Sequence, residues 1–167
     1  FSIPSASSSR YQVMGVDVDL SAVYGQGAKI RFLNTHFDWL PSLGSQEARL
    51  ATVNVIERAF FESGSPPAIL TGDLNAVPDS APLQALKDKG WVNRAGGQEL
   101  FTIPVVNPKR QIDYVLVRPE RSWHILDVEV TDGTYTDDNS HGDMVVSTSA
   151  LDHFEITHDT AGVAGTG

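Results

Sequence analysis

Residues 68–80, Ala-Ile-Leu-Thr-Gly-Asp-Leu-Asn-Ala-Val-Pro-Asp-Ser, constrain the fold and function of this chain more than any other stretch. A short apolar run ends at Gly72 and is followed by a carboxylate, Asp73, and a carboxamide, Asn75. This order predicts a buried strand whose C-terminal end presents polar groups to a cleft. Because side chains alternate along a strand, Asp73 and Asn75 are expected on one side and Leu74 on the other.

The chemistry of this pair has two interpretations. A carboxylate can bind a hard divalent cation or orient a water molecule, and a carboxamide can donate a hydrogen bond to a phosphate oxygen. The structural alternative is a strand-end turn in which both side chains bond only to backbone groups. The Gly-Asp-Leu-Asn string alone leaves both open.

The rest of the chain predicts an α/β domain. Period-two alternation over 11–20 and an apolar run over 29–35, separated by a Gly-Gln-Gly turn, predict a β-hairpin. A helical repeat over 46–62 ends before a glycine and two prolines and leads into the central strand, as a crossover helix does. The sequence further predicts a helix over 80–89 and strands over 100–106, 110–117, 123–130 and 152–157. The stretch 131–149 is expected to be a long polar loop.

Composition limits the function classes. The 167 residues predict a single domain, 1–167, with a core over 10–157 and a flexible tail over 158–167. There is no cysteine, which excludes thiolate metal sites, and no apolar run long enough to span a membrane. A net charge of −9 lacks the basic footprint of a duplex nucleic-acid binder, although acidic clefts can hold divalent cations.

Polar residues stand at the ends of several predicted strands. They are His36 with the less certain neighbour Asp38, Asp73 with Asn75, Asp113, and Asp152 with His153. Strand ends are where α/β domains carry their sites. Asp113 shares a strand face with two valines, so its carboxylate needs a partner. A histidine at a neighbouring strand end is expected, and the order of the motifs given below supplies His153. A buried structural ion pair is the alternative for these two residues.

Four strings in this order are specific together. Asn-Thr-His-Phe-Asp (34–38), Thr-Gly-Asp-Leu-Asn-Ala-Val-Pro-Asp-Ser (71–80), Gln-Ile-Asp-Tyr-Val-Leu-Val-Arg-Pro (111–119) and Asp-His-Phe (152–154) resemble the endonuclease/exonuclease/phosphatase superfamily. The resemblance implies a mixed β-sheet covered by helices on one face, which corresponds to half of a four-layer α-β-β-α sandwich. Two departures are Leu151, where the family has Ser, and the absence of a counterpart to the family's N-terminal half with its metal-binding Glu.

The resemblance implies hydrolysis of a phosphoester by water, assisted by Mg²⁺ or Mn²⁺. It implies that Asp73 positions the water, Asn75 holds the water or the phosphate, and His36 contacts the phosphoryl oxygens. His153, oriented by Asp113, would act as general acid/base or contact the phosphate, and Asp152 would bind the metal. The acid excess favours a small phosphoester or a phospholipid head group over nucleic acid, which stays an alternative.

Two rival functions remain. A chain that lacks the metal-binding Glu can be a catalytically incomplete half-domain that serves binding or assembly. The polar loop can be a separate cation site, through Asp137, Asp138, His141 and Asp143. In either case the inner face of a lone half-sandwich would be apolar and bare, so the N-terminal half or a second chain is the expected partner.

Overall fold

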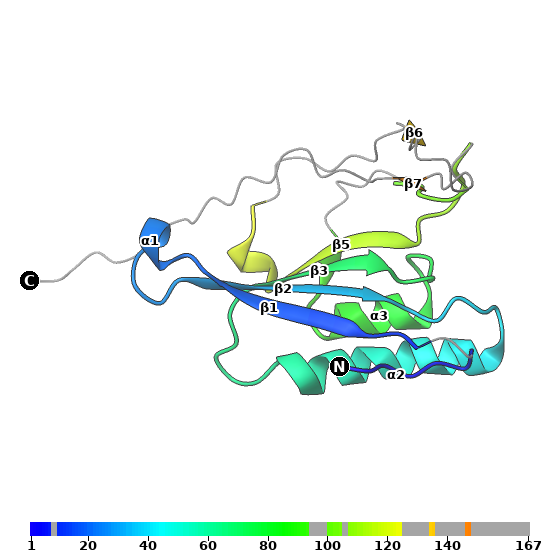
Figure 1. The fold of residues 1–167 in the computed structure, drawn as a ribbon, viewed down its shortest axis with the longest axis horizontal. Helices are drawn as coiled ribbons and strands as arrows, with labels where there is room; N and C mark the ends of the chain where they lie inside the picture. Colours follow the sequence, from blue (N-terminus) through cyan, green and yellow to red (C-terminus); the bar gives the residue numbers. More distant parts are fainter. Residues whose placement is uncertain (8–9, 94–99, 105–106, 125–133, 136–145, 148–167) are drawn as a thin grey trace, which may run out of the picture.

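In the computed structural model, two helices pack against one face of a five-stranded mixed sheet (Figure 1). The structure describes residues 1–7, 10–93, 100–104, 107–124, 134–135 and 146–147. The predicted last strand (152–157) and the predicted tail (158–167) therefore lie outside the described residues. The elements are β1 (Val13–Asp19), α1 (Ser21–Tyr24), β2 (Lys29–His36), α2 (Leu43–Phe60), β3 (Ala68–Asp73), α3 (Ala81–Asp88), β4 (Val92–Asn93), β5 (Asp113–Arg118), the 3₁₀ turn η1 (Glu120–Ser122), β6 (Thr134–Tyr135) and β7 (Val146–Ser147).

The sheet order is β1-β2-β3-β5-β4. The predicted hairpin is confirmed, because β1 pairs antiparallel with β2. The crossover through α2 makes β2 and β3 parallel, whereas β5 pairs antiparallel with β3. The short strands β6 and β7 pair with each other. The predicted fold class, a mixed sheet with helices on one face, is confirmed.

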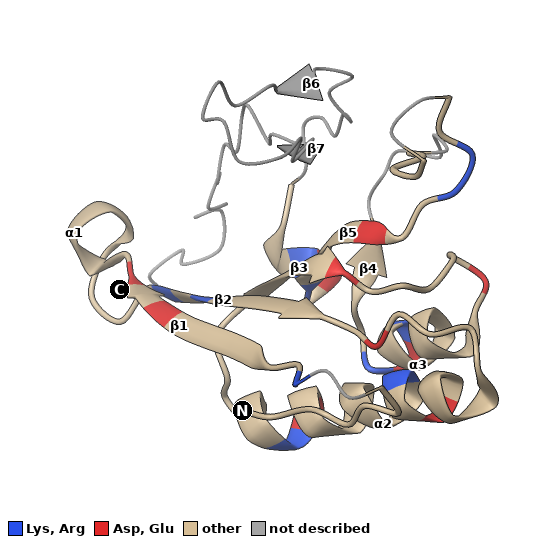
Figure 2. Cartoon of the chain, turned by 45° about the vertical axis from the view of Figure 1, so that its right-hand side comes forward, with Lys and Arg blue, Asp and Glu red and all other residues tan. Residues whose placement is uncertain are grey.

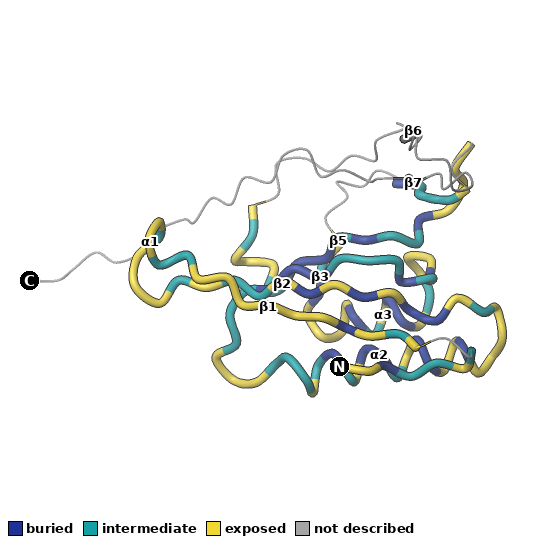
Figure 3. The backbone as a smooth tube through the Cα atoms, viewed as in Figure 1, coloured by how far each residue is buried: buried dark blue, intermediate teal, exposed yellow. Residues whose placement is uncertain are grey.

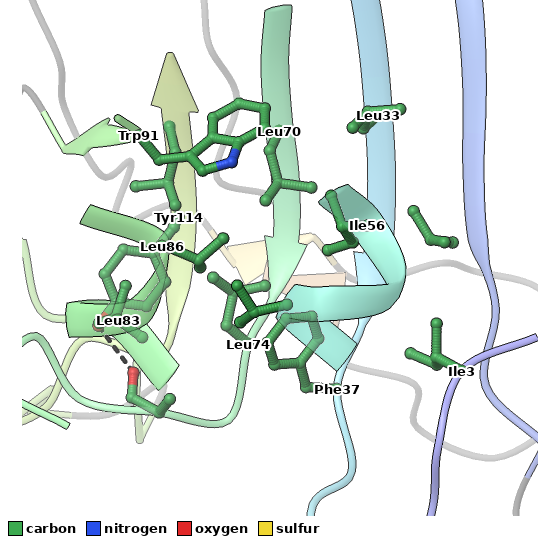
Figure 4. Close-up of a cluster of buried hydrophobic side chains, with 14 of the residues drawn as sticks. Ile3, Leu33, Phe37, Ile56, Leu70, Leu74, Leu83, Leu86, Trp91 and Tyr114 are labelled. Carbon is green, nitrogen blue, oxygen red and sulfur yellow. Dashed lines mark hydrogen bonds between the residues drawn. The ribbon is translucent and has the colours of Figure 1, made fainter. Parts of the chain in front are cut away.

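Side-chain alternation gives the sheet two different faces. Leu33, Leu70 and Leu116 lie in register on the helix-covered face, where they are buried. With Ile56 of α2 and Leu86 of α3 they form one apolar core (Figure 4). On the opposite face, the outer strands expose Met14, Val16, Val18 and Phe32, and Met14 and Val16 are 62% and 56% exposed (Figure 3).

Several predicted boundaries were wrong. The crossover helix begins at Leu43, because the Ser42 hydroxyl accepts a hydrogen bond from the Ser45 N–H, and it ends at Phe60. In its described part, 100–104, the predicted strand over 100–106 has only an isolated bridge from Ile103 to Arg110, next to Pro104, which cannot donate to a ladder. Trp123 and His124, the described part of the predicted strand 123–130, are not in a strand. The short elements α1 and β4 were not predicted, nor were β6 and β7, which lie within the stretch 131–149 that was expected to be a loop.

Among the described residues, the structure has no helix with the length and apolarity needed to span a bilayer.

Candidate active site

Most of the predicted site residues lie at one edge of the sheet. The parallel strands β2 and β3 both end there, and the antiparallel strand β5 begins there. The register places His36 level with Asp73, and Asp73 level with Asp113. Acidic positions at the end of β3 and at the start of β5 accordingly lie at the same edge (Figure 2). Three of the predicted residues therefore occupy adjacent strand ends.

Gly72 allows the ends of β2 and β3 to come close together. Its φ is +140°, and a Cβ atom at this position would lie 1.8 Å from the carbonyl oxygen of Thr35. One residue further on, the Phe37 N–H donates to the Asp73 carbonyl at 2.9 Å. A side chain at position 72 would push the two strands apart, so the glycine is needed for the juxtaposition of His36 and Asp73.

Asp73 and Asn75 form a tight turn after β3. The Asp73 Oδ1 accepts the Asn75 N–H at 2.7 Å, and Asn75 has a positive φ of 46°. The Asn75 Nδ2 donates to the Phe37 carbonyl at 3.1 Å, while Leu74 is buried. Both side chains thus bond to backbone, as the structural alternative predicted. The second carboxylate oxygen of Asp73 is directed elsewhere, toward His36.

His36 faces Asp73 through one ring nitrogen. Its Nδ1 lies 2.8 Å from the Phe37 carbonyl, and because a carbonyl only accepts, Nδ1 carries the proton. Its Nε2 lies 3.7 Å from Asp73 Oδ2, which is an ion-pair distance if the ring is protonated. The His36 side chain is 51% exposed and that of Asp73 is 26% exposed. The ring of Tyr11 stacks on His36, with centroids 5.2 Å apart and planes 6° from parallel.

The surroundings of Asp73 make ionisation of its carboxyl group less favourable than in water. Burial raises the pKa of its carboxyl above the ordinary value, and the charge of Asp113 adds to this. The Asn75 N–H and His36 act in the opposite direction but do not cancel the effect. A cation or a positively charged ligand group placed between the two carboxylates would stabilise their ionised forms.

Asp113 is half-buried at the start of β5. Its backbone is fixed by two side chains: the Asp113 N–H donates to Thr102 Oγ1 and the Asp113 carbonyl accepts from Gln111 Nε2, both at 3.3 Å. Its predicted partner His153 and the predicted metal ligand Asp152 lie outside the described residues. The hydrogen bond between Asp113 and His153 therefore stays a prediction.

Asp38 does not belong to this edge, although its position in the Asn-Thr-His-Phe-Asp string suggested it as a neighbour. Its carboxylate is fully buried and accepts five hydrogen bonds. The donors are the Ser5 and Ser45 hydroxyls and the backbone N–H groups of Ala6, Ser7 and Leu40. Burial alone would raise the pKa of Asp38, but these bonds outweigh it and hold the pKa well below its ordinary value. Asp38 fixes the N-terminal segment to the start of α2.

Tyr11 was not recognised from the sequence. The hairpin register could have located it, because extending the pairing of Val13 with Thr35 by two residues places Tyr11 level with Phe37. The described residues contain no group of three His, Cys, Asp or Glu side chains arranged to hold a metal ion. The described part of the edge therefore does not complete a cation site by itself.

Comparisons with known proteins identify the fold. Three solved structures share it over the matched part, at sequence identities that indicate fold alone. An endonuclease/exonuclease/phosphatase family protein of Bacteroides thetaiotaomicron is 23% identical, with a TM-score of 0.52, over 70% of this chain and 44% of that one. A mannosyl-6-phosphatase of Bacteroides thetaiotaomicron VPI-5482 is 22% identical, with a TM-score of 0.52, over 67% and 45%. An endonuclease/exonuclease/phosphatase of Bacteroides vulgatus is 21% identical, with a TM-score of 0.54, over 66% and 44%.

In each case the match spans less than half of the solved structure. A search of curated proteins found no match. The profile of the Endonuclease/Exonuclease/phosphatase family matches residues 10–157, which is most of the chain and includes all four sequence strings. The chain belongs to the Endonuclease/Exonuclease/phosphatase family.

Proposed function

We propose that this chain is the C-terminal part of a divalent-metal-dependent phosphoester hydrolase, in which water attacks phosphorus at the edge formed by β2, β3 and β5. The observation that carries the proposal is the convergence of His36, Asp73 and Asp113 on adjacent strand ends, with Asn75 in the turn that follows. Family membership supports a phosphoesterase or nuclease activity.

Each described residue has a role that its contacts allow. Asp73 Oδ2, the oxygen not used by the Asn75 N–H, accepts a proton from the attacking water and orients it. One N–H of the Asn75 amide is held by the Phe37 carbonyl, and the other can donate to a phosphoryl oxygen. His36 donates from Nε2 to the phosphoryl group when its ring is protonated, since Nδ1 is already bound to Phe37.

The remaining roles involve His153 and Asp152, which lie outside the described residues. We propose that Asp113 hydrogen-bonds to His153, fixes its tautomer and supports it as general acid/base, and that Asp152 contributes to the metal site. Mg²⁺ or Mn²⁺ would supply charge neutralisation for the phosphoryl oxygens. The described residues do not complete a cation site, and we propose that further oxygen ligands come from Asp152 and from an N-terminal half that carries a Glu.

The open face of the sheet supports a partner for this chain. Met14, Val16, Val18 and Phe32 form an exposed apolar stripe across β1 and β2 on the face opposite the helices. Such a stripe is typical of a covered interface. We propose that the N-terminal half of a four-layer sandwich, or a second chain, covers it. Sedimentation of this polypeptide alone, residues 1–167, should show association or aggregation, and a monomer that unfolds cooperatively would contradict this part of the proposal.

The alternative function is a catalytically incomplete binding or assembly module. The incomplete cation site of the described residues favours it. The two functions differ in one measurable respect: the module binds its ligand without consuming it.

The test is a substrate panel for the full-length protein with Mg²⁺, with Mn²⁺ and with a chelator. The substrates are bis-p-nitrophenyl phosphate, p-nitrophenyl phosphate, mannose 6-phosphate, a phospholipid with a choline head group, and plasmid DNA. We expect metal-dependent hydrolysis of a small phosphoester or of the head group, and a loss of at least about 10²-fold in turnover for Asp73→Asn and Asp113→Asn. Asp79→Asn, on an exposed loop after Asn75, is the matched control with unchanged activity.

No hydrolysis of any substrate, or full activity in both variants, would refute the proposal. Efficient DNA nicking with a steep salt dependence would instead move the substrate class to nucleic acid.

A further inference from the structure

Among the described residues, the His36 ring makes one hydrogen bond, from Nδ1 to the Phe37 carbonyl. The distance of 3.7 Å from Nε2 to Asp73 Oδ2 is too long for a second hydrogen bond. A half-exposed imidazole with one hydrogen bond can still turn about the bond to its Cβ atom. The second constraint on the ring plane is Tyr11, whose ring lies nearly parallel to the imidazole at 5.2 Å between centroids.

We propose that Tyr11 is the positioning residue for His36: its ring fixes the imidazole plane so that Nε2 is directed toward Asp73 and the open edge of the sheet. The proposal rests on the proposed phosphoester hydrolase. It adds a residue that lies outside the Asn-Thr-His-Phe-Asp string and that acts through His36 without touching the substrate.

Tyr11 is itself held on two sides. Its carbonyl accepts the Ile3 N–H at 3.2 Å, and the next residue, Gln12, accepts the Thr35 hydroxyl at 3.1 Å. These bonds connect it to the N-terminal segment and to β2. The N-terminal segment is anchored in turn on the buried carboxylate of Asp38, two residues after His36. Both stacked rings are thus tied to one anchor, which makes the stack a fixed part of the edge.

The first experiment measures the stack directly, without activity. In the full-length protein, NMR signals of the His36 ring protons should be shifted upfield by the Tyr11 ring current, relative to those of the exposed His124. Tyr11→Leu should abolish this upfield shift and Tyr11→Phe should keep it. Tyr24→Leu, in α1 at the opposite end of β2, is the matched control and should leave the His36 signals unchanged. An unshifted His36 in the wild-type protein would overturn the proposal whether or not any variant folds.

The second experiment asks whether the stack serves catalysis. Tyr11→Leu should lower kcat on the best phosphoester by about tenfold, because a small misplacement of a catalytic group is costly, while KM changes little. Tyr11→Phe should retain the wild-type kcat. In a His36→Ala background, Tyr11→Leu should cause no further loss, since its effect passes through His36.

An equal loss from Tyr11→Leu with and without His36, or a loss of kcat in Tyr11→Phe equal to that in Tyr11→Leu, would overturn the positioning role. If the wild-type protein hydrolyses none of the phosphoesters, the proposed function fails, and the NMR measurement still decides whether Tyr11 holds His36.

Discussion

Replacing Asp38 by Asn tests the interpretation that a buried carboxylate organises the N-terminal segment. The substitution keeps the size of the side chain and removes one acceptor oxygen together with the charge. In the wild-type structure, Oδ2 accepts from Ser5, Ala6 and Ser7 at 2.7, 2.7 and 3.1 Å. Oδ1 accepts from Leu40 and Ser45 at 3.1 and 2.8 Å.

The better orientation of the Asn amide places its NH₂ group at the Oδ1 position, where there are fewer donors. The Ser45 hydroxyl can rotate and accept, but the Leu40 N–H then loses its partner, at a cost of about 1–3 kcal/mol. The three bonds to the other oxygen change from charged to neutral and each weakens by about 0.5–1 kcal/mol. Removal of the buried charge offsets part of this sum, so we expect Asp38→Asn to lower the free energy of unfolding by about 2–4 kcal/mol.

The dependence on pH follows from the direction of the pKa shift. The folded-state pKa of Asp38 lies below its unfolded value, which is about 3.9, so its stabilising contribution is present above that value and is lost as the pH falls through the folded pKa. The difference between wild type and Asp38→Asn should therefore be constant from pH 7 to about pH 5 and shrink only in more acidic solution.

Urea unfolding of the full-length protein, followed by circular dichroism at several pH values, measures this difference. Asp17→Asn is the matched control, because Asp17 is paired with Arg31 on an exposed strand and should contribute less than about 1 kcal/mol. The reasoning would be refuted if Asp38→Asn unfolded within about 0.5 kcal/mol of wild type at neutral pH with an unchanged m-value.

Three further predictions concern the edge of the sheet. Gly72→Ala should destabilise the protein by more than about 3 kcal/mol in urea unfolding, because the added Cβ atom would clash with the Thr35 carbonyl. Gly27 has open space around it, so Gly27→Ala should lower the free energy of unfolding by only about 1 kcal/mol. Equal losses in the two variants would contradict the close approach of β2 and β3. Asp73→Asn should lower turnover by at least about 10²-fold yet leave the protein as stable or more stable at pH 7. Since burial and Asp113 raise the folded-state pKa of Asp73, the contribution of this residue to stability is favourable only at low pH and is lost as the pH rises through that pKa. A clear drop in melting temperature at pH 7 would therefore contradict the assignment. Tyr114→Phe should lower the free energy of unfolding by about 1–3 kcal/mol, because the buried hydroxyl donates to the Ala76 carbonyl at 2.7 Å and lies 3.1 Å from the Gln111 carbonyl. Burial raises the pKa of Tyr114, so the difference in melting temperature between this variant and the wild type should not change between pH 6 and 9.

The sequence predicted those features that depend on short-range patterns. Alternation over β1 and the Gly-Asp-Leu-Asn turn after β3 were sufficient to place the hairpin and to select Asp73 and Asn75. The end of α2 could not be read, because Gly64 marks the later turn, whereas the helix stops four residues earlier at Phe60. The strand predicted over 100–106 was wrong in its described part, because apolar composition alone does not show whether a neighbouring strand is available for pairing.

For the candidate site as well, the residues that stand out in a local pattern were predicted and those that depend on long-range contacts were not. Conspicuous strand-end residues such as His36 and Asp113 were found because each one interrupts an apolar run. Asp38 is buried away from the candidate site because residues 5–7, more than 30 positions earlier, donate hydrogen bonds to its carboxylate. No local sequence pattern reveals these contacts. Tyr11 was missed because its relation to His36 depends on strand register, a long-range property.

The strand order has a consequence for the growing chain. Strand β5 lies between β3 and β4, although it follows both in the sequence. Before residues 113–118 have been synthesised, one edge of β3 has no partner and β4 has no strand to join, so the nascent domain presents unpaired backbone groups. Nascent chains that stop before Asp113 should therefore be prone to capture by chaperones, and release from them should follow the emergence of Arg118 from the exit tunnel.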